Sequence, residues 1–279
     1  MKKTLIKLGR MIGLVIVGSL ALLTGCQGKF IYFPRPYAAG EIESWQKKTR
    51  GEIISYTTEH GKQQAYLQRQ VRQQGPPNRL WIVGAGNGSL ALDMADWIWD
   101  HGDPRDAYIL IDYPGYGPCE SSPNPSRINA NVLAAVPAAV EKLGLTMDAV
   151  RPKLRIFAHS LGCAAMLSGA KELGIHRGIL IAPFTSTMEM SKKVIGVNLG
   201  FLVYHRFDNV ARLGEVVTPD AKFIIFHGSE DEVIPVEMSR EMKAKFPAMI
   251  DYHEIPEGQH NDLLLLSRKD IATAIKALD

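Results

Sequence analysis

The sequence predicts an α/β protein in which a mostly parallel central sheet is covered by helices on both faces. Short apolar, β-branched runs alternate with longer stretches of helical periodicity, which is the order typical of such a sheet. Residues 109–111 and 223–226 contain no polar side chain, which indicates strands buried on both faces. The chain has 279 residues, 46% hydrophobic and 22% charged. This composition allows a large core and excludes disordered, collagen-like and disulfide-scaffold proteins.

The first 25 residues have the pattern of a secretory signal. Four basic residues and no acidic one lie in the first ten positions, and residues 11–23 are apolar apart from two glycines and a serine. This run is shorter than the roughly 20 residues that a membrane-spanning helix needs. We therefore expect residues 1–25 to be a removable signal peptide. Its loss changes the formal net charge from +3 to −1. The net charge of the mature chain therefore gives no reason to expect a nucleic-acid partner.

The signal ends in Leu23-Thr24-Gly25-Cys26, which resembles the lipobox of bacterial lipoproteins. The resemblance implies that a lipid such as palmitate is attached to the Cys26 thiol, and that Cys26 becomes the N-terminus after cleavage. Gln27 stands at the next position instead of Asp, as in Gram-negative lipoproteins sent to the outer membrane. We therefore expect a cell-envelope protein, anchored to that membrane on its periplasmic side if the source is Gram-negative. An ordinary signal peptide and an uncleaved anchor helix are the alternatives.

Residues 26–36 are expected to form the lipidated cysteine and a tether, and residues 37–279 one domain with a small helical lid at 184–220. The domain shows no repeat, low-complexity tract or interior linker. The predicted strands are 52–57 and 65–71, paired as a hairpin, followed by 80–83, 107–112, 154–158, 178–181, 222–226 and 249–255. The predicted helices are 90–99, 126–143, 160–173, 236–246 and 263–278. Pro137 should kink or shorten the second helix.

The strongest local signal is a serine between a predicted strand and a predicted helix. Residues 154–162 read Leu-Arg-Ile-Phe-Ala-His-Ser-Leu-Gly, with Ser160 at the turn. A nucleophile elbow needs small residues two positions before and two after its serine, and Ala158 and Gly162 hold these positions. The usual pattern is Gly-x-Ser-x-Gly, so Ala158 departs from it. A serine that only caps the helix is the alternative.

With this elbow the sequence resembles the α/β-hydrolase superfamily, and within it the small-lid branch of α/β-hydrolase-domain and serine aminopeptidase-like proteins. The resemblance covers most of the mature chain, from about residue 31 to the C-terminus. Ala85 replaces the histidine of the His-Gly-Asn loop of that branch. The matching segments are residues 83–89, 111–117, 183–186, 206–209, 226–235 and 257–262.

The resemblance implies a triad of Ser160, Asp231 and His260, which follow one another in the chain order of this fold. His260 would take the proton of the Ser160 hydroxyl and return it to the leaving group, and Asp231 would fix the His260 tautomer. The backbone N–H groups of Leu161 and Asn87 are assigned to the oxyanion hole. No cofactor is implied. No metal is expected either, because the sequence has no His-x-x-x-His or Cys-x-x-Cys pair.

Residues near the triad in the sequence offer competing assignments. Glu230 and Glu232 flank Asp231, and only the register of the acid loop selects the aspartate. The side chain of His159 should point away from the base position, and the remaining histidines, His227 among them, are expected at the surface or in packing. A dinucleotide loop at the glycine-rich residues 84–88 is disfavoured, because the third glycine of Gly-x-Gly-x-x-Gly is missing.

Other residues near these motifs are predicted to be structural. Asp112 and Tyr113 should shape the turn beside the active site, and Cys163 should pack as a small apolar side chain. Export would permit a disulfide between Cys119 and Cys163 without showing that one forms.

The lid is the remaining guide to substrate. About 39 residues separate the predicted strands on either side of it, so we expect a fairly open site. Apolar residues in the lid suit an acyl-chain wall, or else pack on the sheet. The leading hypothesis is a membrane-anchored serine hydrolase that cleaves acyl esters or thioesters of a small-molecule or lipid substrate, as a monomer by default. A peptidase or acyltransferase with the same triad, and a binding lipoprotein without turnover, are the alternatives.

Overall fold

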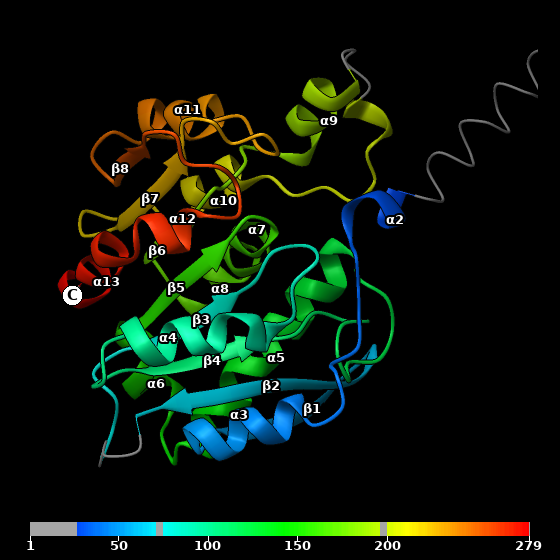
Figure 1. Ribbon diagram of the computed structural model, residues 1–279, viewed down its shortest axis with the longest axis vertical. Helices are drawn as coiled ribbons and strands as arrows, with labels where there is room; N and C mark the ends of the chain where they lie inside the picture. Colours follow the sequence, from blue (N-terminus) through cyan, green and yellow to red (C-terminus); the bar gives the residue numbers. More distant parts are fainter. Residues whose placement is uncertain (1–26, 71–74, 196–199, 279) are drawn as a thin grey trace, which may run out of the picture.

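The computed structural model describes residues 27–70, 75–195 and 200–278 (Figure 1). The expected signal peptide and Cys26 therefore lie outside the described residues. None of the helices in the described ranges is both long and apolar enough to cross a membrane.

Eight strands form one sheet in the order β1-β2-β4-β3-β5-β6-β7-β8. Strands β1 and β2 form an antiparallel hairpin, β2 pairs antiparallel with β4, and all pairs from β4 to β8 are parallel. The predicted fold class and its eight strands are confirmed. The bounds are β1 Glu52–Thr58, β2 Gly61–Arg69, β3 Leu80–Gly84, β4 Ala107–Ile111, β5 Leu154–His159, β6 Arg177–Ile181, β7 Lys222–Gly228 and β8 Ile250–Ile255.

Helices connect the parallel strands and cover both faces of the sheet (Figure 1). The α-helices are α2 Gln27–Ile31, α3 Glu41–Thr49, α4 Ala95–His101, α5 Pro125–Lys142, α6 Met147–Val150, α7 Leu161–Ser168, α8 Ala170–Leu173, α9 Thr187–Ile195, α10 Asn209–Glu215, α11 Glu237–Lys245, α12 Leu263–Leu266 and α13 Arg268–Ala277. Short 3₁₀ helices are η1 Ala91–Met94, η2 Arg151–Lys153 and η3 Gly200–Leu202.

The core lies in two layers, because successive strand residues point to opposite faces of the sheet. In β3, Leu80 and Ile82 pack with α5 and α7, whereas Trp81 and Val83 pack with α4 and α13. These layers bury nearly all of the apolar surface of the five central strands. They also hold the carboxyl ends of β3, β5, β6 and β7 at one edge of the sheet, which is where ligands bind in folds of this class.

Three of the five predicted helices are divided or begin differently in the structure. The expected helix 160–173 divides at Gly169 into α7 and α8, and the expected helix 263–278 divides at Ser267 into α12 and α13. The expected helix 90–99 begins with the 3₁₀ turn η1. The prediction that Pro137 shortens its helix is wrong, since α5 continues to Lys142. The Pro137 ring lies on the exposed side of α5, and the opposite side packs on the core.

Candidate active site

Ser160 lies at a sharp turn between β5 and α7. Its backbone has φ 55° and ψ −121°, a conformation that costs a residue with a side chain on the order of 1–3 kcal/mol. The turn persists because the Ser160 N–H donates to the Ile181 carbonyl of β6 at 2.8 Å, and the Cys163 N–H donates to the Ser160 carbonyl at 3.0 Å. The serine is thus fixed at the carboxyl edge of the sheet, at the start of a helix.

Gly162 allows the elbow to pack against the loop after β3. A Cβ atom at position 162 would lie 2.1 Å from the carbonyl oxygen of Gly84 and 2.7 Å from that of Ala85. Only glycine permits this approach, because both neighbouring atoms belong to backbone. Ala158, which replaces the first glycine of the usual pattern, is fully buried between β3 and β6 and fits there without strain.

Asp231 lies in the loop after β7, and its side chain is fully buried. One carboxylate oxygen accepts hydrogen bonds from the N–H groups of Val233 and Ile234 at 2.9 and 2.7 Å. The other accepts from Nδ1 of His260 at 2.7 Å and contacts Nε2 of His227 at 3.2 Å. Burial raises the pKa of Asp231, but the bonds from the two histidines outweigh this and hold it well below its usual range. The carboxylate therefore stays ionised.

His260 completes a continuous chain of hydrogen bonds. Its Nε2 lies 2.9 Å from Oγ of Ser160, and its Nδ1 lies 2.7 Å from Asp231. The Nδ1–H must donate to the carboxylate, so Nε2 is free to accept the serine proton. The flanking acids do not replace Asp231: Glu230 and Glu232 are exposed, and the Glu232 carboxylate accepts from the His260 backbone N–H at 3.2 Å. The structure thus brings together the three side chains that the sequence singled out.

Two further histidines lie at this site, and both differ from the prediction. The His159 ring does not point away from the base. It lies 4.9 Å from the His260 ring, centroid to centroid, and its Nε2 is 3.0 Å from the His260 carbonyl. Burial and the neighbouring His260 lower the pKa of His159 to about 4, so this ring stays neutral beside the triad.

His227 is fully buried behind Asp231. Its Nε2–H donates to the Ile234 carbonyl at 2.9 Å, and its Nδ1 accepts from the Ser239 hydroxyl at 2.6 Å. These bonds fix the ring against the carboxylate. The prediction of a surface or packing role missed this contact, because the sequence carries no signal for it beyond the four-residue spacing from Asp231.

The residues assigned to the oxyanion hole lie on adjoining segments. Leu161 is the first residue of α7, where helix N–H groups have no acceptor within the helix. The Asn87 peptide is held from two sides: its carbonyl accepts from the Phe33 N–H at 3.0 Å and from the Tyr116 hydroxyl. The Asn87 side chain donates to the Ile31 carbonyl at 3.0 Å. The N-terminal segment after Cys26 therefore contacts the loop of the candidate site, which the sequence did not predict.

Asp112 and Tyr113 form hydrogen bonds with the segment that follows β3. Asp112 accepts from the Ala91 N–H at 2.8 Å and the Tyr37 hydroxyl at 2.9 Å, and burial raises its pKa to about 6. The Tyr113 hydroxyl donates to the Ala85 carbonyl at 2.7 Å. Their predicted structural role is confirmed. Cys119 and Cys163 are both buried and free, so a disulfide between them is not present.

The lid comprises α9, η3 and α10. Met190 packs on the core, whereas Met188 and Tyr204 are exposed, so part of the apolar surface of the lid packs on the protein and part of it is open to solvent. The side chains of residues 194–199 are outside the description. The reacting groups themselves are buried, since Ser160 is only 6% exposed and His260 only 5%.

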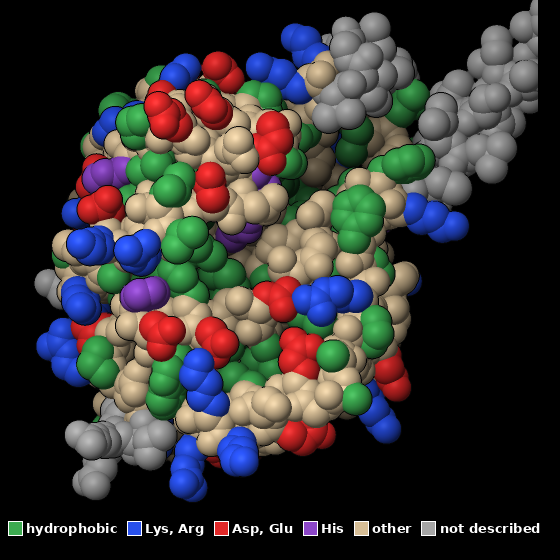
Figure 2. All heavy atoms as spheres, in the orientation of Figure 1, with side chains coloured by type: hydrophobic (Ala, Val, Ile, Leu, Met, Phe, Trp, Pro, Cys, Tyr) green, Lys and Arg blue, Asp and Glu red, His purple; other side chains and the backbone are tan. Residues whose placement is uncertain are grey.

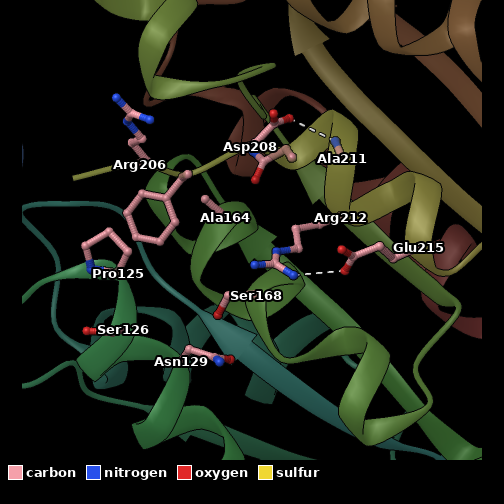
Figure 3. Close-up of a pocket in the computed structure, with 12 residues that line it drawn as sticks. Pro125, Ser126, Asn129, Ala164, Ser168, Arg206, Asp208, Ala211, Arg212 and Glu215 are labelled. Carbon is pink, nitrogen blue, oxygen red and sulfur yellow. Dashed lines mark hydrogen bonds and ion pairs between the residues drawn. The ribbon is translucent and has the colours of Figure 1, made fainter. Parts of the chain in front are cut away.

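A cavity of about 420 Å³ lies beside α7, between α5 and α10 (Figure 3). Its wall includes Ala164 and Ser168 from α7, and charged side chains from and just before α10, where Arg212 pairs with Glu215 at 2.9 Å. None of the three triad residues lines it. In the ranges that the structure describes, no cluster of His, Cys, Asp and Glu side chains is arranged to hold a metal ion.

Comparison with known proteins gives distant relatives and a common fold. No protein-family model matches the chain. An uncharacterised protein of Mycobacterium tuberculosis is 26% identical over 271 residues, which span 95% of this chain and 91% of that protein. The α/β hydrolase domain-containing protein 17C of Xenopus laevis is 24% identical over 82% of this chain and 71% of its own length.

Two solved structures are similar over most of their length. An esterase of Pyrococcus furiosus superposes with a TM-score of 0.62 at 12% identity, over 88% of this chain and 95% of the esterase. An α/β hydrolase of Vibrio vulnificus superposes with a TM-score of 0.63 at 15% identity, over 85% and 87% of the two chains. Together with the strand order and the connections between strands, this similarity shows that the chain has the α/β-hydrolase fold.

Proposed function

We propose that this protein is a membrane-anchored serine hydrolase that cleaves carboxylic esters or thioesters through an acyl-enzyme on Ser160. The observation that carries the proposal is the unbroken hydrogen-bond chain from Ser160 through His260 to Asp231, with distances of 2.9 and 2.7 Å. A serine hydroxyl is a poor nucleophile unless a base takes its proton, and this chain provides the base.

In the proposed mechanism, Oγ of Ser160 attacks the carbonyl carbon of the ester while its proton moves to Nε2 of His260. The imidazolium that forms is stabilised by Asp231, whose lowered pKa keeps it charged throughout. Collapse of the tetrahedral intermediate expels the alcohol or thiol, which receives the proton from His260. Water then repeats the sequence on the acyl-enzyme, and the N–H groups of Leu161 and Asn87 stabilise the oxyanion in both steps.

The anchor is the second part of the proposal, and it rests on the lipobox that ends at Cys26. Lipid on the Cys26 thiol would hold the enzyme at the cell-envelope membrane, within reach of acyl esters in that membrane. The relatives support the hydrolase class and not the anchor: two are named hydrolases or hydrolase-domain proteins, and one is named an esterase.

A fluorophosphonate probe tests the nucleophile, because an activated serine displaces its fluoride and forms a stable bond to phosphorus. The full chain should be labelled, and Ser160→Ala should abolish labelling without loss of the circular dichroism of the folded protein. Ser168→Ala is the matched control, since this buried serine lies on the same helix and only donates to the Ala165 carbonyl. Labelling that survives Ser160→Ala, or disappears in Ser168→Ala alone, refutes the assignment.

Substrate class and anchor need separate measurements. Hydrolysis rates on matched acyl esters, thioesters and amides should favour the first two, and a faster rate on amides would identify a peptidase. Cys26→Ala should release the protein from bacterial membranes or block its processing. An unchanged membrane fraction in that variant would refute the lipobox.

A further inference from the structure

The exposed large apolar side chains of the described residues are distributed unevenly. Of eight such side chains, seven lie in the N-terminal segment, in α9, just after η3, or in the segments that follow Asp231 and His260. The exception is Val217, which precedes β7 and so lies at the opposite, amino edge of the sheet. Four of the seven lie on α2, on the residues that follow it and on the lid segments near it, and we call these four the apolar rim. It consists of Phe30, Phe33, Met188 and Tyr204.

Hydrogen bonds and a ring contact link the N-terminal segment to the lid. The Gln27 side chain donates to the Leu202 carbonyl at 2.5 Å and accepts from the Tyr204 N–H at 2.7 Å. Tyr32 stacks edge-on against His205, with ring centroids 5.3 Å apart and a 3.2 Å contact from its hydroxyl to Nδ1. The chain that follows Cys26 is therefore attached directly to the lid.

The same segment reaches the oxyanion loop. The Phe33 N–H donates to the Asn87 carbonyl, and the Asn87 side chain donates to the Ile31 carbonyl. Figure 2 shows apolar and basic side chains around α2, beside the hollow between α2 and the helices of the lid. The rim thus borders the side of the candidate active site that carries the proposed oxyanion loop.

The chemistry of the rim fits a membrane surface. Three of its four members are aromatic, and Phe30 and Tyr204 are 72% and 69% exposed, as is typical of side chains that enter the boundary between headgroups and acyl chains. Lys29 on α2 and Lys192 and Lys193 on α9 are exposed, and the exposed acids of lid residues 187–208 are Glu189 and Asp208. Such lysines are attracted to anionic lipid headgroups.

The position of the proposed anchor indicates that a membrane covers the rim. Cys26 directly precedes Gln27, so the two Cα atoms are only about 3.8 Å apart. Lipid attached there would bring the bilayer to the rim and leave no length of tether over which the domain could turn away. An N-terminus held by bonds to Leu202, Tyr204 and Asn87 transmits that constraint to the whole domain.

We propose that the apolar rim inserts into the bilayer that holds the anchor, and that it turns the oxyanion-loop side of the catalytic site toward the membrane. The substrate would then be an acyl lipid or lipidated molecule drawn from the same leaflet. This inference rests on the anchor of the proposed function, and it adds an orientation and a substrate class that the triad alone does not define.

Depth measurements test the orientation. The full chain is purified from bacterial membranes and reconstituted in vesicles of phosphatidylethanolamine and phosphatidylglycerol. Tyr204→Cys and the matched control Val217→Cys then receive an environment-sensitive fluorophore. Cys119 and Cys163 should not react because both are buried, and burial raises the pKa of Cys119 to about 12. Labelling of the unmodified chain reports whether Cys26 carries a free thiol.

Spin-labelled lipid should quench the fluorophore at position 204 and shift its emission to the blue, while the fluorophore at position 217 stays unquenched. Equal quenching at both positions, or none at position 204, overturns the proposal. This readout needs no turnover, so it remains informative even if Ser160 proves unreactive.

Activity tests the consequence for substrate. The double variant Phe30→Ser/Tyr204→Ser should hydrolyse a long-chain ester in vesicles about tenfold more slowly, because the lost apolar area weakens insertion. Its rate on a soluble short-chain ester should be unchanged, and Val217→Ser should be unaffected on both substrates. Equal losses on both substrates, or no loss on vesicles, contradict the inference. Absence of turnover by the unmodified chain would contradict the proposed function instead.

Discussion

The elbow around Ser160 and the apolar rim border the same candidate active site, but they are held in place by different forces. The elbow is buried backbone packed on backbone, with Gly162 against the carbonyl of Gly84. The rim is held by a few side-chain bonds from Gln27 and Tyr32, and its own side chains are exposed. Chemistry and substrate access therefore depend on separate parts of the structure. Changes in the elbow should affect every substrate, whereas changes in the rim should affect only substrates in a membrane.

The largest expected effect is that of Asp231→Asn. The asparagine has nearly the same shape, but it cannot hold His260 in the tautomer that leaves Nε2 free, so kcat on a soluble ester should fall by about four orders of magnitude. Steady-state rates of the purified variant give the measurement. Glu230→Gln and Glu232→Gln are the matched controls, because both neighbours are exposed. A loss in Asp231→Asn no greater than in these controls would place the acid elsewhere.

Gly162→Ala should have the next largest effect, this time on stability. The added methyl group would lie 2.1 Å from the Gly84 oxygen and 2.4 Å from its carbonyl carbon, and backbone cannot move away cheaply. Urea denaturation should show the free energy of unfolding lowered by about 3 kcal/mol, with loss of fluorophosphonate labelling.

Gly214→Ala is the control for this variant, because its methyl group would meet nothing closer than 3.9 Å, at Phe246. Within helix α10 that change should raise the free energy of unfolding by about 0.5–1 kcal/mol. Similar destabilisation by both substitutions would show that the elbow is not tightly packed.

The sequence predicted the parts of the structure that depend on local pattern. All eight strands were predicted because their apolar runs are buried on at least one face. The largest boundary error was at β2, which begins four residues early, because residues 61–64 are polar yet pair with β1. Helix α3 was missed because charged residues conceal its short apolar side, with Trp45 its main buried side chain.

The candidate site likewise has features that the sequence predicts and contacts that it does not predict. The turn at Ser160 and the order of Asp231 and His260 can be identified from motifs. The contacts of His159, His227 and Gln27 cannot, because each joins segments that only the folded sheet and lid bring together. No sequence spacing predicts that residue 27 binds residue 204.

The pH dependence of the free energy of unfolding should distinguish His159, beside the buried triad, from a histidine in the lid. The lowered pKa of His159, about 4, means that the folded protein binds fewer protons than the unfolded chain between pH 4 and 6.5. Its contribution to stability is therefore complete above pH 6.5 and is lost as the pH falls toward 4. His159→Gln should recover about 2 kcal/mol of this loss at pH 4, a value reduced because the ring is only partly buried.

Denaturation midpoints across this pH range provide the measurement. His205→Gln in the lid is the control, since burial lowers the pKa of His205 less and the contact with Tyr32 is partly exposed. A pH profile that His159→Gln leaves unchanged would mean that the His159 ring is solvated and not held against His260.

Gln27→Ala should have the smallest effect, and it is confined to the rim. The variant loses the bonds to the Leu202 carbonyl and the Tyr204 N–H. Together these bonds contribute about 1 kcal/mol to the attachment of the N-terminal segment to the lid. Hydrogen exchange at the Tyr204 amide should accelerate about fivefold, while global unfolding and soluble-ester hydrolysis stay unchanged. Gln27→Glu retains the acceptor for that amide and should preserve most of its protection. Unchanged exchange in Gln27→Ala would show that the lid is held without the N-terminal segment, and the anchor would then have no rigid connection through which to orient the catalytic site.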